Sequence, residues 1–545
     1  MTECYKNNGT KQFRANPMQQ PLQPLVPAPL TYKPERTRTN LFSALLRAAS
    51  EFGADKPILV DGDERVLTYK EIIRAVFGLG SALRKGTKRG DAVGVMLPTG
   101  AGAVIGFFAL TAYGRVPAML NFTAGSKNLK SAMRAAKVKR MITAHKFVEL
   151  GGLQDLISEL SKSVEIIYLE DVREKLSIGD KIAAVAGPLV PSLVASRLGS
   201  KQPGVILFTS GTEGEPKGVV LSHENIMANI EQVRAHIGLS PDTDIVFNPL
   251  PTFHCFGLTV GALLPLIGGL KVIFHPSPLQ PKEIVRRIRE SRSTILLATD
   301  TFISQYARTG SEGDLDTIRL AVCGAERVKD ETRAYVRRKY NIEILEGYGA
   351  TEAAPVVAAN QWEHNKPGTV GRLMAGMESK LVPVEGMPEG GRFHIRGPNV
   401  MMGYLRPSNP GVIEQLRDGW HDTGDIVDID EEGFIRILGR VKRFAKIGGE
   451  MVSLAVVENC AAAVWPDHMH AAVTLPDPKK GEQVVLLSEA PDAARTPILE
   501  WAQSQGVPEI SVPRRVFKVG HIPVLGTGKV DYSAVRLEAE RLMND

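Results

Sequence analysis

The stretch "GVILFTSGTEGEPKGVVLSHENI", from Gly204 to Ile226, runs from an apolar segment through a loop into a helical pattern. "GVILF" is short, continuous and rich in aliphatic residues, which predicts a buried parallel strand. The loop beyond it supplies hydroxyl donors, glycines that let backbone amides come close to a ligand, and a mobile ammonium. These groups come from Thr209, Ser210, Gly211, Thr212, Gly214 and Lys217. They are the parts of a phosphate site, although a flexible surface turn is the more common explanation of such a loop when it is taken alone.

This loop departs from the Walker pattern G-x-x-x-x-G-K-[ST]. Counting from Gly211, Pro216 stands where the second glycine belongs, and Gly218 stands where the magnesium-binding hydroxyl belongs. The sequence therefore excludes a P-loop NTPase. A phosphate-binding role needs support from other parts of the chain.

Composition limits the classes of protein to consider. The chain has 545 residues, of which 43% are apolar, and a net charge of +6. That charge is too small to indicate nucleic-acid binding. The four cysteines, at positions 4, 255, 323 and 460, form no C-x-x-C pair. We therefore expect neither a disulfide framework nor a zinc site, and a reducing cytoplasm suits the chain best.

No segment has the pattern of a signal peptide or a membrane span. The first residues, "MTECYKNNGTKQFRANPMQQ", lack an apolar core. The most apolar stretches, 101–114 and 260–270, are shorter than the ~20 residues that a spanning helix requires, so we expect both in the core. The sequence predicts a cytoplasmic protein and leaves peripheral contact with the inner membrane face open.

Three parts of the chain differ in composition and in the spacing of their apolar residues. Residues 1–38 are proline-rich and basic, which predicts an extended tail. In 39–441, helical patterns alternate with apolar runs such as "GLKVIFH" and "STILLAT", which predicts an α/β domain of doubly wound sheets with ligands at the strand ends. After Gly368, glycine-punctuated strands predict a β-barrel-like part. Beyond "RVKRFAKIGGE", residues 442–545 predict a small α+β domain.

Five further stretches follow the opening loop in order. They are "LPTFHCFG" (250–257), "CGAERV" (323–328), "EGYGATEAAP" (346–355), "GWHDTGDIVDIDEEGFIRILGRVKRFAKIGGE" (419–450) and "IPVLGTGKVDY" (522–532). With that loop they resemble the adenylate-forming superfamily of acyl-CoA synthetases, luciferases and peptide-synthetase adenylation domains. The resemblance extends from about residue 40 to the C-terminus.

One branch of the superfamily is more similar than the others. "KPGTVGRL", "GPNVMMGYL" and especially "KRFAKIGGEMVSL" look like the acyl-acyl carrier protein synthetases and the synthetase half of the bifunctional lysophosphatidylethanolamine acyltransferase. The acyltransferase half of those proteins carries an H-x-x-x-x-D pair. None of the eleven histidines here has an aspartate five residues on, so the resemblance is to the synthetase alone.

The resemblance implies a reaction that uses ATP and Mg²⁺ in two steps. A fatty-acid carboxylate attacks the α-phosphate of ATP to give acyl-adenylate and pyrophosphate, and a thiol then takes the acyl group. By analogy with the family, the opening loop closes over the β- and γ-phosphates. Tyr348 stacks on adenine, Asp425 accepts from the ribose hydroxyls, and Arg440 reaches ribose or phosphate. Gly324, Ala325 and Glu326 match the segment that lines the adenine base in relatives.

The same resemblance implies four catalytic residues. Lys529 bridges carboxylate and α-phosphate oxygens, and Thr351 donates to the α-phosphate. Glu352 is the residue implied to hold the Mg²⁺. His254 is implied beside the reactive acyl carbon, where it gates carboxylate entry; a lone histidine among apolar residues is more often structural.

The C-terminal part is implied to move between the two steps. Lys442 occupies the hinge position, and rotation about it exchanges Lys529 for Gly448 and Gly449, which line the thiol tunnel. Relatives usually carry a glutamate where this chain has Val456, which makes the small-domain helix less certain.

"DIDEEG" (428–433) has a calcium loop as its rival interpretation. Gly433 falls correctly at position six, but position twelve is Gly439 instead of a bidentate glutamate. We therefore expect a hairpin, in which the acidic residues form the polar face and the turn.

Three functions are compatible with these motifs. The leading hypothesis is ligation of a fatty acid to the phosphopantetheine thiol of acyl carrier protein; the alternative is a fatty acyl-CoA ligase that uses free CoA. A non-ligating binding protein is disfavoured because the full residue set is retained. An acidic carrier needs a basic docking surface. Candidates, which also suit CoA phosphates or a solvated face, are Arg286, Arg287, Arg289, Arg292, Lys442, Arg443, Lys446, Arg514 and Arg515.

Overall fold

The structure is a computed structural model. It describes residues 29–191, 195, 197–210, 215–384, 387, 389–447, 450–478, 481–524 and 530–544. The opening stretch forms strands β7 (Pro203–Ser210) and β8 (Pro216–Ser222), which pair antiparallel with Thr209 opposite Lys217. On its other side β7 pairs parallel with β4 (Val116–Met119), which confirms the predicted buried strand.

These strands lie inside an eight-stranded sheet in the order β19-β18-β8-β7-β4-β3-β5-β6. Its remaining strands are β3 (Ala92–Val95), β5 (Arg140–Thr143), β6 (Glu165–Tyr168), β18 (Gly403–Arg406) and β19 (Asn409–Gln415). Among the helices of this part of the chain are α2 (Tyr69–Leu83), α3 (Ala101–Ala112), α4 (Gly125–Ala135), α5 (His145–Leu150), α6 (Gln154–Ser161), α7 (Leu169–Glu174) and α8 (Ile178–Ala186).

A second sheet has nine strands in the order β15-β14-β13-β12-β11-β9-β10-β1-β2. Its strands are β1 (Pro57–Val60), β2 (Val66–Thr68), β9 (Ile245–Asn248), β10 (Lys271–Phe274), β11 (Ile295–Ala298), β12 (Leu320–Cys323), β13 (Glu343–Gly349), β14 (Val356–Ala359) and β15 (Arg372–Leu373). The helices with it are α1 (Leu41–Phe52), α10 (His223–His236), α11 (Leu264–Gly268), α12 (Pro281–Ser291), α13 (Asp300–Thr309) and α14 (Asp330–Tyr340).

One hydrophobic core joins the two sheets. It contains Phe107 of α3, Ile226 of α10 and Leu296 of β11, each fully buried. The apolar stretches 101–114 and 260–270 both lie in it, the second as a π-helical turn (Phe256–Leu263) followed by α11, so their assignment to the core is confirmed. Among the described residues, no helix combines the length and the apolarity needed to cross a bilayer.

The remaining strands form two smaller sheets. Strands β16 (Glu378–Val382), β17 (Gly391–Arg396), β20 (His421–Ile429) and β21 (Ile435–Arg440) make an antiparallel sheet, the expected glycine-punctuated β part. The hairpin β20–β21 closes with a hydrogen bond from Asp430 N–H to the Phe434 carbonyl at 3.1 Å, as expected for "DIDEEG".

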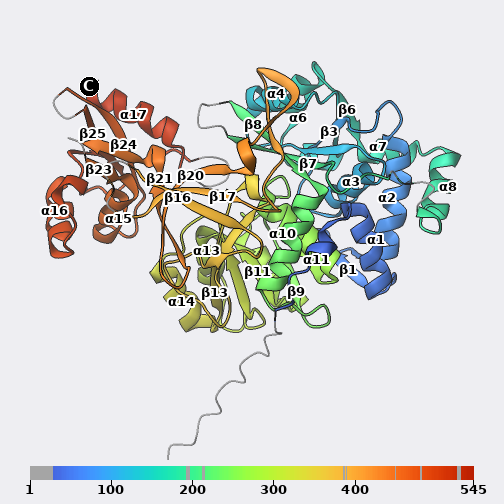
Figure 1. The fold of residues 1–545 in the computed structure, drawn as a ribbon, viewed down its shortest axis with the longest axis horizontal. Coiled ribbons are helices and arrows are strands. Elements are labelled where there is room, and N and C mark those ends of the chain that lie inside the picture. Colours follow the sequence, from blue (N-terminus) through green and yellow to red (C-terminus); the bar gives the residue numbers. More distant parts are fainter. Residues whose placement is uncertain are drawn as a thin grey trace, which may run out of the picture.

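The C-terminal sheet contains β22 (Phe444–Ile447), β23 (Glu450–Ser453), β24 (His470–Asp477), β25 (Gly481–Ser488) and β26 (Arg515–Lys518). It packs with α15 (Leu454–Val464), α16 (Arg495–Ser504) and α17 (Tyr532–Asn544) around two hydrophobic clusters of its own. Figure 1 shows these elements at one end of the molecule and α8 at the other. The α/β fold with a C-terminal α+β part is confirmed, and Val456 does not prevent helix α15 from forming.

The packed chain reaches further toward the N-terminus than the sequence predicted. Residues Pro34–Thr37 form a 3₁₀ turn, and the Leu30 N–H donates to the Arg234 carbonyl of α10 at 3.3 Å. The last residues of the expected tail therefore lie against α10.

Candidate functional site

Tyr348 and Asp425 bring the large sheet and the small antiparallel sheet together. The Tyr348 hydroxyl, at the end of β13, donates to Oδ2 of Asp425 on β20. Arg440, opposite Asp425 on β21, donates from Nε to Oδ1 at 3.0 Å. Burial, and then the nearby Asp425 charge, raise the pKa of Tyr348 well above its usual range. The tyrosine therefore acts as a donor to a carboxylate that is itself buried.

A second carboxylate, Glu352, is held by Tyr404. Glu352 lies in a 3₁₀ turn (Thr351–Ala353) just beyond β13, and the Tyr404 hydroxyl of β18 donates to its Oε1 at 2.8 Å. The Lys217 Nζ of β8 lies 5.5 Å from the centroid of the same ring. Burial, followed by the Glu352 charge, raises the pKa of Tyr404. Tyr404 thus links the predicted phosphate-loop lysine to the predicted magnesium ligand.

His421 sits among three carboxylates. It is 6% exposed and belongs to β20, and burial lowers its pKa although the charges of Glu352, Asp422 and Asp425 act in the opposite direction. Sequence reasoning missed both His421 and Tyr404. The available signals were the tyrosine of "GYL" and the position of His421 four residues before Asp425.

His254 lies just before the π-helical turn Phe256–Leu263. Its neighbour Cys255 is buried, and burial raises the pKa of the Cys255 thiol to about 12, with a smaller contribution from the Glu352 charge. The His254 ring packs against Phe253 with centroids 4.7 Å apart. The predicted gate residue is therefore close to the residues after β13.

The segment Gly324 to Glu326 directly follows β12, whose neighbour in the sheet is β13. A Cβ placed on Gly324 would lie 3.5 Å from the Gly347 carbonyl, so this segment and the Tyr348 motif are side by side. Ala325 has a left-handed backbone, with φ of 68°. The Glu326 carboxylate instead accepts from the N–H and the hydroxyl of Thr301, which directs it toward the start of α13.

Several predicted site residues lie outside the described part. They are Gly211, Thr212, Gly214, Gly448, Gly449 and Lys529, together with the side chain of Ser210. Thr209, Thr351 and Lys442 are described, and Lys442 is exposed in a 3₁₀ turn (Val441–Arg443) between β21 and β22. Among the described residues, no group of three or more histidine, cysteine, aspartate or glutamate side chains is placed to hold a metal ion.

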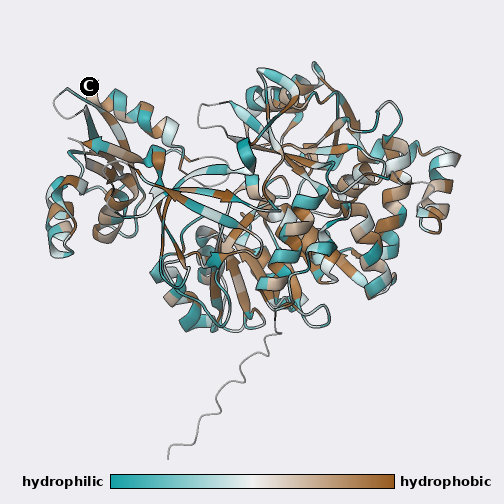
Figure 2. Cartoon of the chain, in the orientation of Figure 1, coloured by the Kyte–Doolittle hydropathy of each residue, from teal (hydrophilic) through white to brown (hydrophobic). Residues whose placement is uncertain are grey.

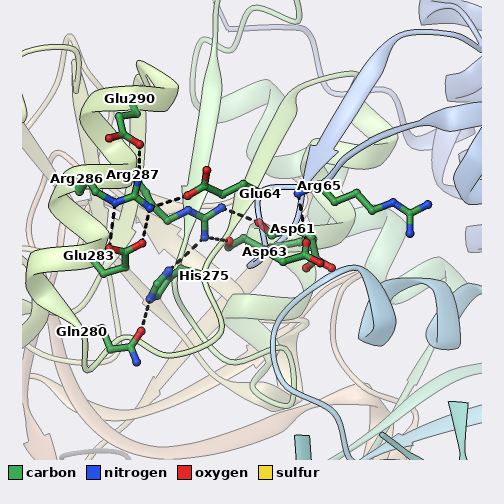
Figure 3. A network of polar contacts seen from close by, with 11 residues as sticks. Asp61, Asp63, Glu64, Arg65, His275, Gln280, Glu283, Arg286, Arg287 and Glu290 are labelled. Atoms are coloured by element: carbon green, nitrogen blue, oxygen red, sulfur yellow. Dashed lines mark hydrogen bonds and ion pairs between the residues drawn. The ribbon is translucent and has the colours of Figure 1, made fainter. Parts of the chain in front are cut away.

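The arginine cluster of α12 does not form a free basic surface. The Arg286 guanidinium pairs with Glu64 at 2.6 Å and also with Glu283 and Glu290 (Figure 3). Arg287 is buried and donates to the carbonyls of Phe274 and Asp61. Both groups are engaged within the chain, and the docking of an acidic partner to this part of α12 stays a prediction.

Two of the other candidate docking arginines are also engaged. Arg443 forms an ion pair with Glu458 at 2.7 Å and lies over the Tyr532 ring, 3.6 Å from its centroid. Arg514 pairs with Asp477. Arg515 is exposed and has no ion pair with any acidic side chain in the described ranges. Charge reversal at Arg443 would therefore disrupt the C-terminal core instead of testing a surface.

Two curated relatives are similar in sequence to this chain over most of its length. The chain is 29% identical over 485 residues to a feruloyl-CoA synthase from an Amycolatopsis species, covering 86% of this chain and 93% of that protein. It is 26% identical over 545 residues to the long-chain-fatty-acid–CoA ligase of Salmonella typhimurium, with 94% and 96% covered.

The fold has matches among solved structures. ATP-bound MatB from Rhodopseudomonas palustris superposes with a TM-score of 0.78 at 23% identity, over 92% of this chain and 99% of that one. The Bacillus subtilis o-succinylbenzoate CoA synthetase with its acyl-adenylate gives 0.78 at 20% identity, over 92% and 98%. The family model for AMP-binding enzymes matches residues 45–405, and the chain belongs to this family of AMP-binding enzymes.

Proposed function

We propose that this chain is an AMP-forming ligase that activates a fatty acid with ATP and transfers the acyl group to a thiol. The observation that carries the proposal is the pair of carboxylates, Asp425 and Glu352, each of which accepts a hydrogen bond from a tyrosine hydroxyl: Tyr348 at the end of β13 for Asp425, and Tyr404 of β18 for Glu352. They are the two carboxylates to which the family resemblance assigns the ribose and magnesium contacts.

The hydrogen-bond capacity of Asp425 suits a ribose. A carboxylate has about four acceptor sites. Tyr348 and Arg440 occupy two of them, so the others are available to the two ribose hydroxyls. Since the Tyr348 hydroxyl is engaged with Asp425, the ring of Tyr348 is the part left to contact adenine.

Magnesium fits the site through one carboxylate. Mg²⁺ usually binds one or two protein carboxylates together with the phosphates of its nucleotide, so a cluster of protein ligands is not required. Glu352 would hold the ion, whose role is to neutralise phosphate charge. Lys217 and Thr209 would stabilise the departing pyrophosphate, and Lys529 the α-phosphate.

The acceptor thiol we propose is that of CoA. Relatives named long-chain-fatty-acid–CoA ligase and feruloyl-CoA synthase support it. Three of the nine candidate docking cations, Arg286, Arg443 and Arg514, are also paired with carboxylates of this chain. Acyl carrier protein is the second candidate, favoured by the resemblance of "KRFAKIGGEMVSL" to the acyl carrier protein synthetases.

One assay tests the proposed reaction and separates the two acceptors. Release of AMP is measured with fatty acids of increasing length and with ferulate, each with CoA or with carrier protein. We expect AMP and thioester with a fatty acid and CoA, and a loss of both in Asp425→Ala. Absence of AMP with every acid would refute the ligase proposal, and a preference for carrier protein would replace CoA as the acceptor.

We also propose that residues 442–545 rotate about Lys442 between the two steps. Lys529→Ala is expected to slow adenylation by roughly 10²- to 10³-fold, as for other lost charge-stabilising donors, and to spare thioester formation from supplied acyl-adenylate. Lys442→Pro should do the reverse, because it stiffens the hinge. Equal losses in both half-reactions would contradict the rotation.

A further inference from the structure

Helix α8 turns its largest aliphatic side chains to solvent. Ile178, Ile182, Val185 and Leu189 recur at intervals of three and four residues and are 79%, 59%, 59% and 79% exposed. That spacing puts them on one face, continuing one turn beyond the end of the helix. We name these four residues the apolar stripe. In Figure 1, α8 lies at the edge of the molecule beside α2, and Figure 2 shows hydrophobic colouring on it.

The orientation of α8 is fixed by its opposite face. Asp180 is buried there, accepts from the Ser81 hydroxyl at 2.8 Å and pairs with Lys85, both from the α2 side. A Cβ on Gly78 of α2 would lie only 3.1 Å from the Cβ of Ala184, so the small residues of the two helices are in close contact. If α8 rotated so that the apolar stripe became buried, the contacts of Asp180 and Ala184 would be lost. The packing of α8 against α2 therefore keeps the stripe turned toward solvent.

Exposed cations lie on α8, just before it, and in the turn that follows α2. The turn after α2, "RKGTKRG" (84–90), exposes Arg84, Lys85, Lys88 and Arg89, and the Lys85 Nζ lies 3.2 Å from the Ser177 hydroxyl that caps α8. Lys175 and Lys181 are exposed on the α8 side. Of these six cations, only Lys85 forms an ion pair with a described acidic side chain. We name Arg84, Lys88 and Arg89 the basic turn.

We propose that the apolar stripe and the basic turn form a docking surface for an anionic lipid bilayer. An amphipathic helix binds in the interface plane when its apolar face enters the acyl boundary and nearby cations meet anionic headgroups. The charge pattern favours a bilayer over a second copy of this chain, because two copies meeting here would bring the same cations together. The inference does not depend on the proposed reaction.

Vesicle sedimentation of the full chain, without ATP or fatty acid, tests the surface. The vesicles are phosphatidylcholine with or without phosphatidylglycerol. We expect binding to the mixed vesicles, and a partition coefficient at least about tenfold lower in Ile182→Gln/Leu189→Gln, since two aliphatic groups no longer enter the bilayer. Lys88→Gln/Arg89→Gln should weaken binding about fivefold per residue, on the anionic vesicles only.

Leu279→Gln/Leu537→Gln is the matched control. It removes two exposed aliphatic side chains, 66% and 68% exposed, from other elements, and should bind like the unsubstituted chain. All substituted positions are exposed, so unfolding is not expected, and thermal unfolding checks this. The proposal would be overturned if the unsubstituted chain did not bind the mixed vesicles. It would also be overturned if the control lost as much vesicle binding as Ile182→Gln/Leu189→Gln. A dimer that Ile182→Gln/Leu189→Gln dissociates without changing vesicle binding would overturn it too, because a second copy would then be the occupant.

Discussion

The Tyr348 hydroxyl donates to Asp425 Oδ2, across 77 residues of sequence and between two different sheets. Arg440 holds the other oxygen of that carboxylate. Asp425 is 4% exposed, whereas Arg440 reaches solvent with 65% of its side chain exposed. The buried tyrosine is therefore the fixed partner and the arginine the adaptable one.

Tyr348→Phe should raise the KM for ATP by roughly 10- to 100-fold, because a hydrogen bond to a charged group contributes about 1.5–3 kcal/mol. Pyrophosphate release measures this. Tyr306→Phe is the control: its buried hydroxyl donates to the Pro278 carbonyl at 2.9 Å, so it should reduce stability without affecting ATP. An unchanged KM in Tyr348→Phe would show that Asp425 is positioned without it.

Tyr404→Phe retains the ring beside Lys217 and removes the hydroxyl that orients Glu352. We expect the Mg²⁺ concentration for half-maximal adenylation to rise about tenfold, which corresponds to a hydrogen bond of about 1.4 kcal/mol. Calorimetric titration of the protein with ATP, with and without Mg²⁺, provides a readout besides activity. If the Mg²⁺ dependence is unchanged, Glu352 either does not hold the ion or does not need Tyr404.

Sequence patterns predicted local elements well because helices and buried strands depend on neighbouring residues. The strand before Thr209 and the hairpin at 428–433 are examples. Long-range partners were not predictable in this way. Arg286 looked like free charge until the fold brought Glu64 to it from 222 positions away, and the outward face of α8 depends on the bond between Asp180 and Ser81. A single sequence does not show which residues far apart in the chain form such pairs.

His223 should make the fold sensitive to mild acid. Burial lowers its pKa from 6.5 to about 4, and its Nδ1 accepts from the Leu41 N–H, so protonation would break that bond. A lowered pKa in the folded state means that the unfolded chain binds a proton first. Stability is therefore present above pH 6.5 and lost as the pH falls toward 4, by up to about 3 kcal/mol.

His223→Gln retains an acceptor for Leu41 and removes the titration. The free energy of unfolding, measured with urea at pH values from about 7 down to about 4, should fall less steeply in this variant than in the unsubstituted chain. His364→Gln, at an exposed position, should leave the slope unchanged. Parallel curves for His223→Gln and the unsubstituted chain would exclude His223 as the source.

Arg443→Met should destabilise the C-terminal part by about 3–5 kcal/mol, since it leaves Glu458 as a buried charge without its cation. Burial already raises the pKa of Glu458 above 4.5 while Arg443 opposes the rise, so its loss should raise that pKa further. A raised pKa gives stability that is present below 4.5 and lost as the pH rises. The deficit relative to the unsubstituted chain should therefore be larger near pH ~8 than near pH ~5.

The double variant Arg443→Met/Glu458→Gln provides the decisive comparison. Glutamine retains an acceptor for the Ala472 N–H, which donates to Glu458 at 2.8 Å in the unsubstituted chain, but it carries no charge. Replacing both members of a buried ion pair is usually far less harmful than removing one. We expect urea unfolding of the double variant to recover most of the lost stability and to lose its extra pH dependence. If the double variant is as unstable as Arg443→Met, the contact of Arg443 with Tyr532 is what stabilises this core, and the charge of Glu458 is secondary.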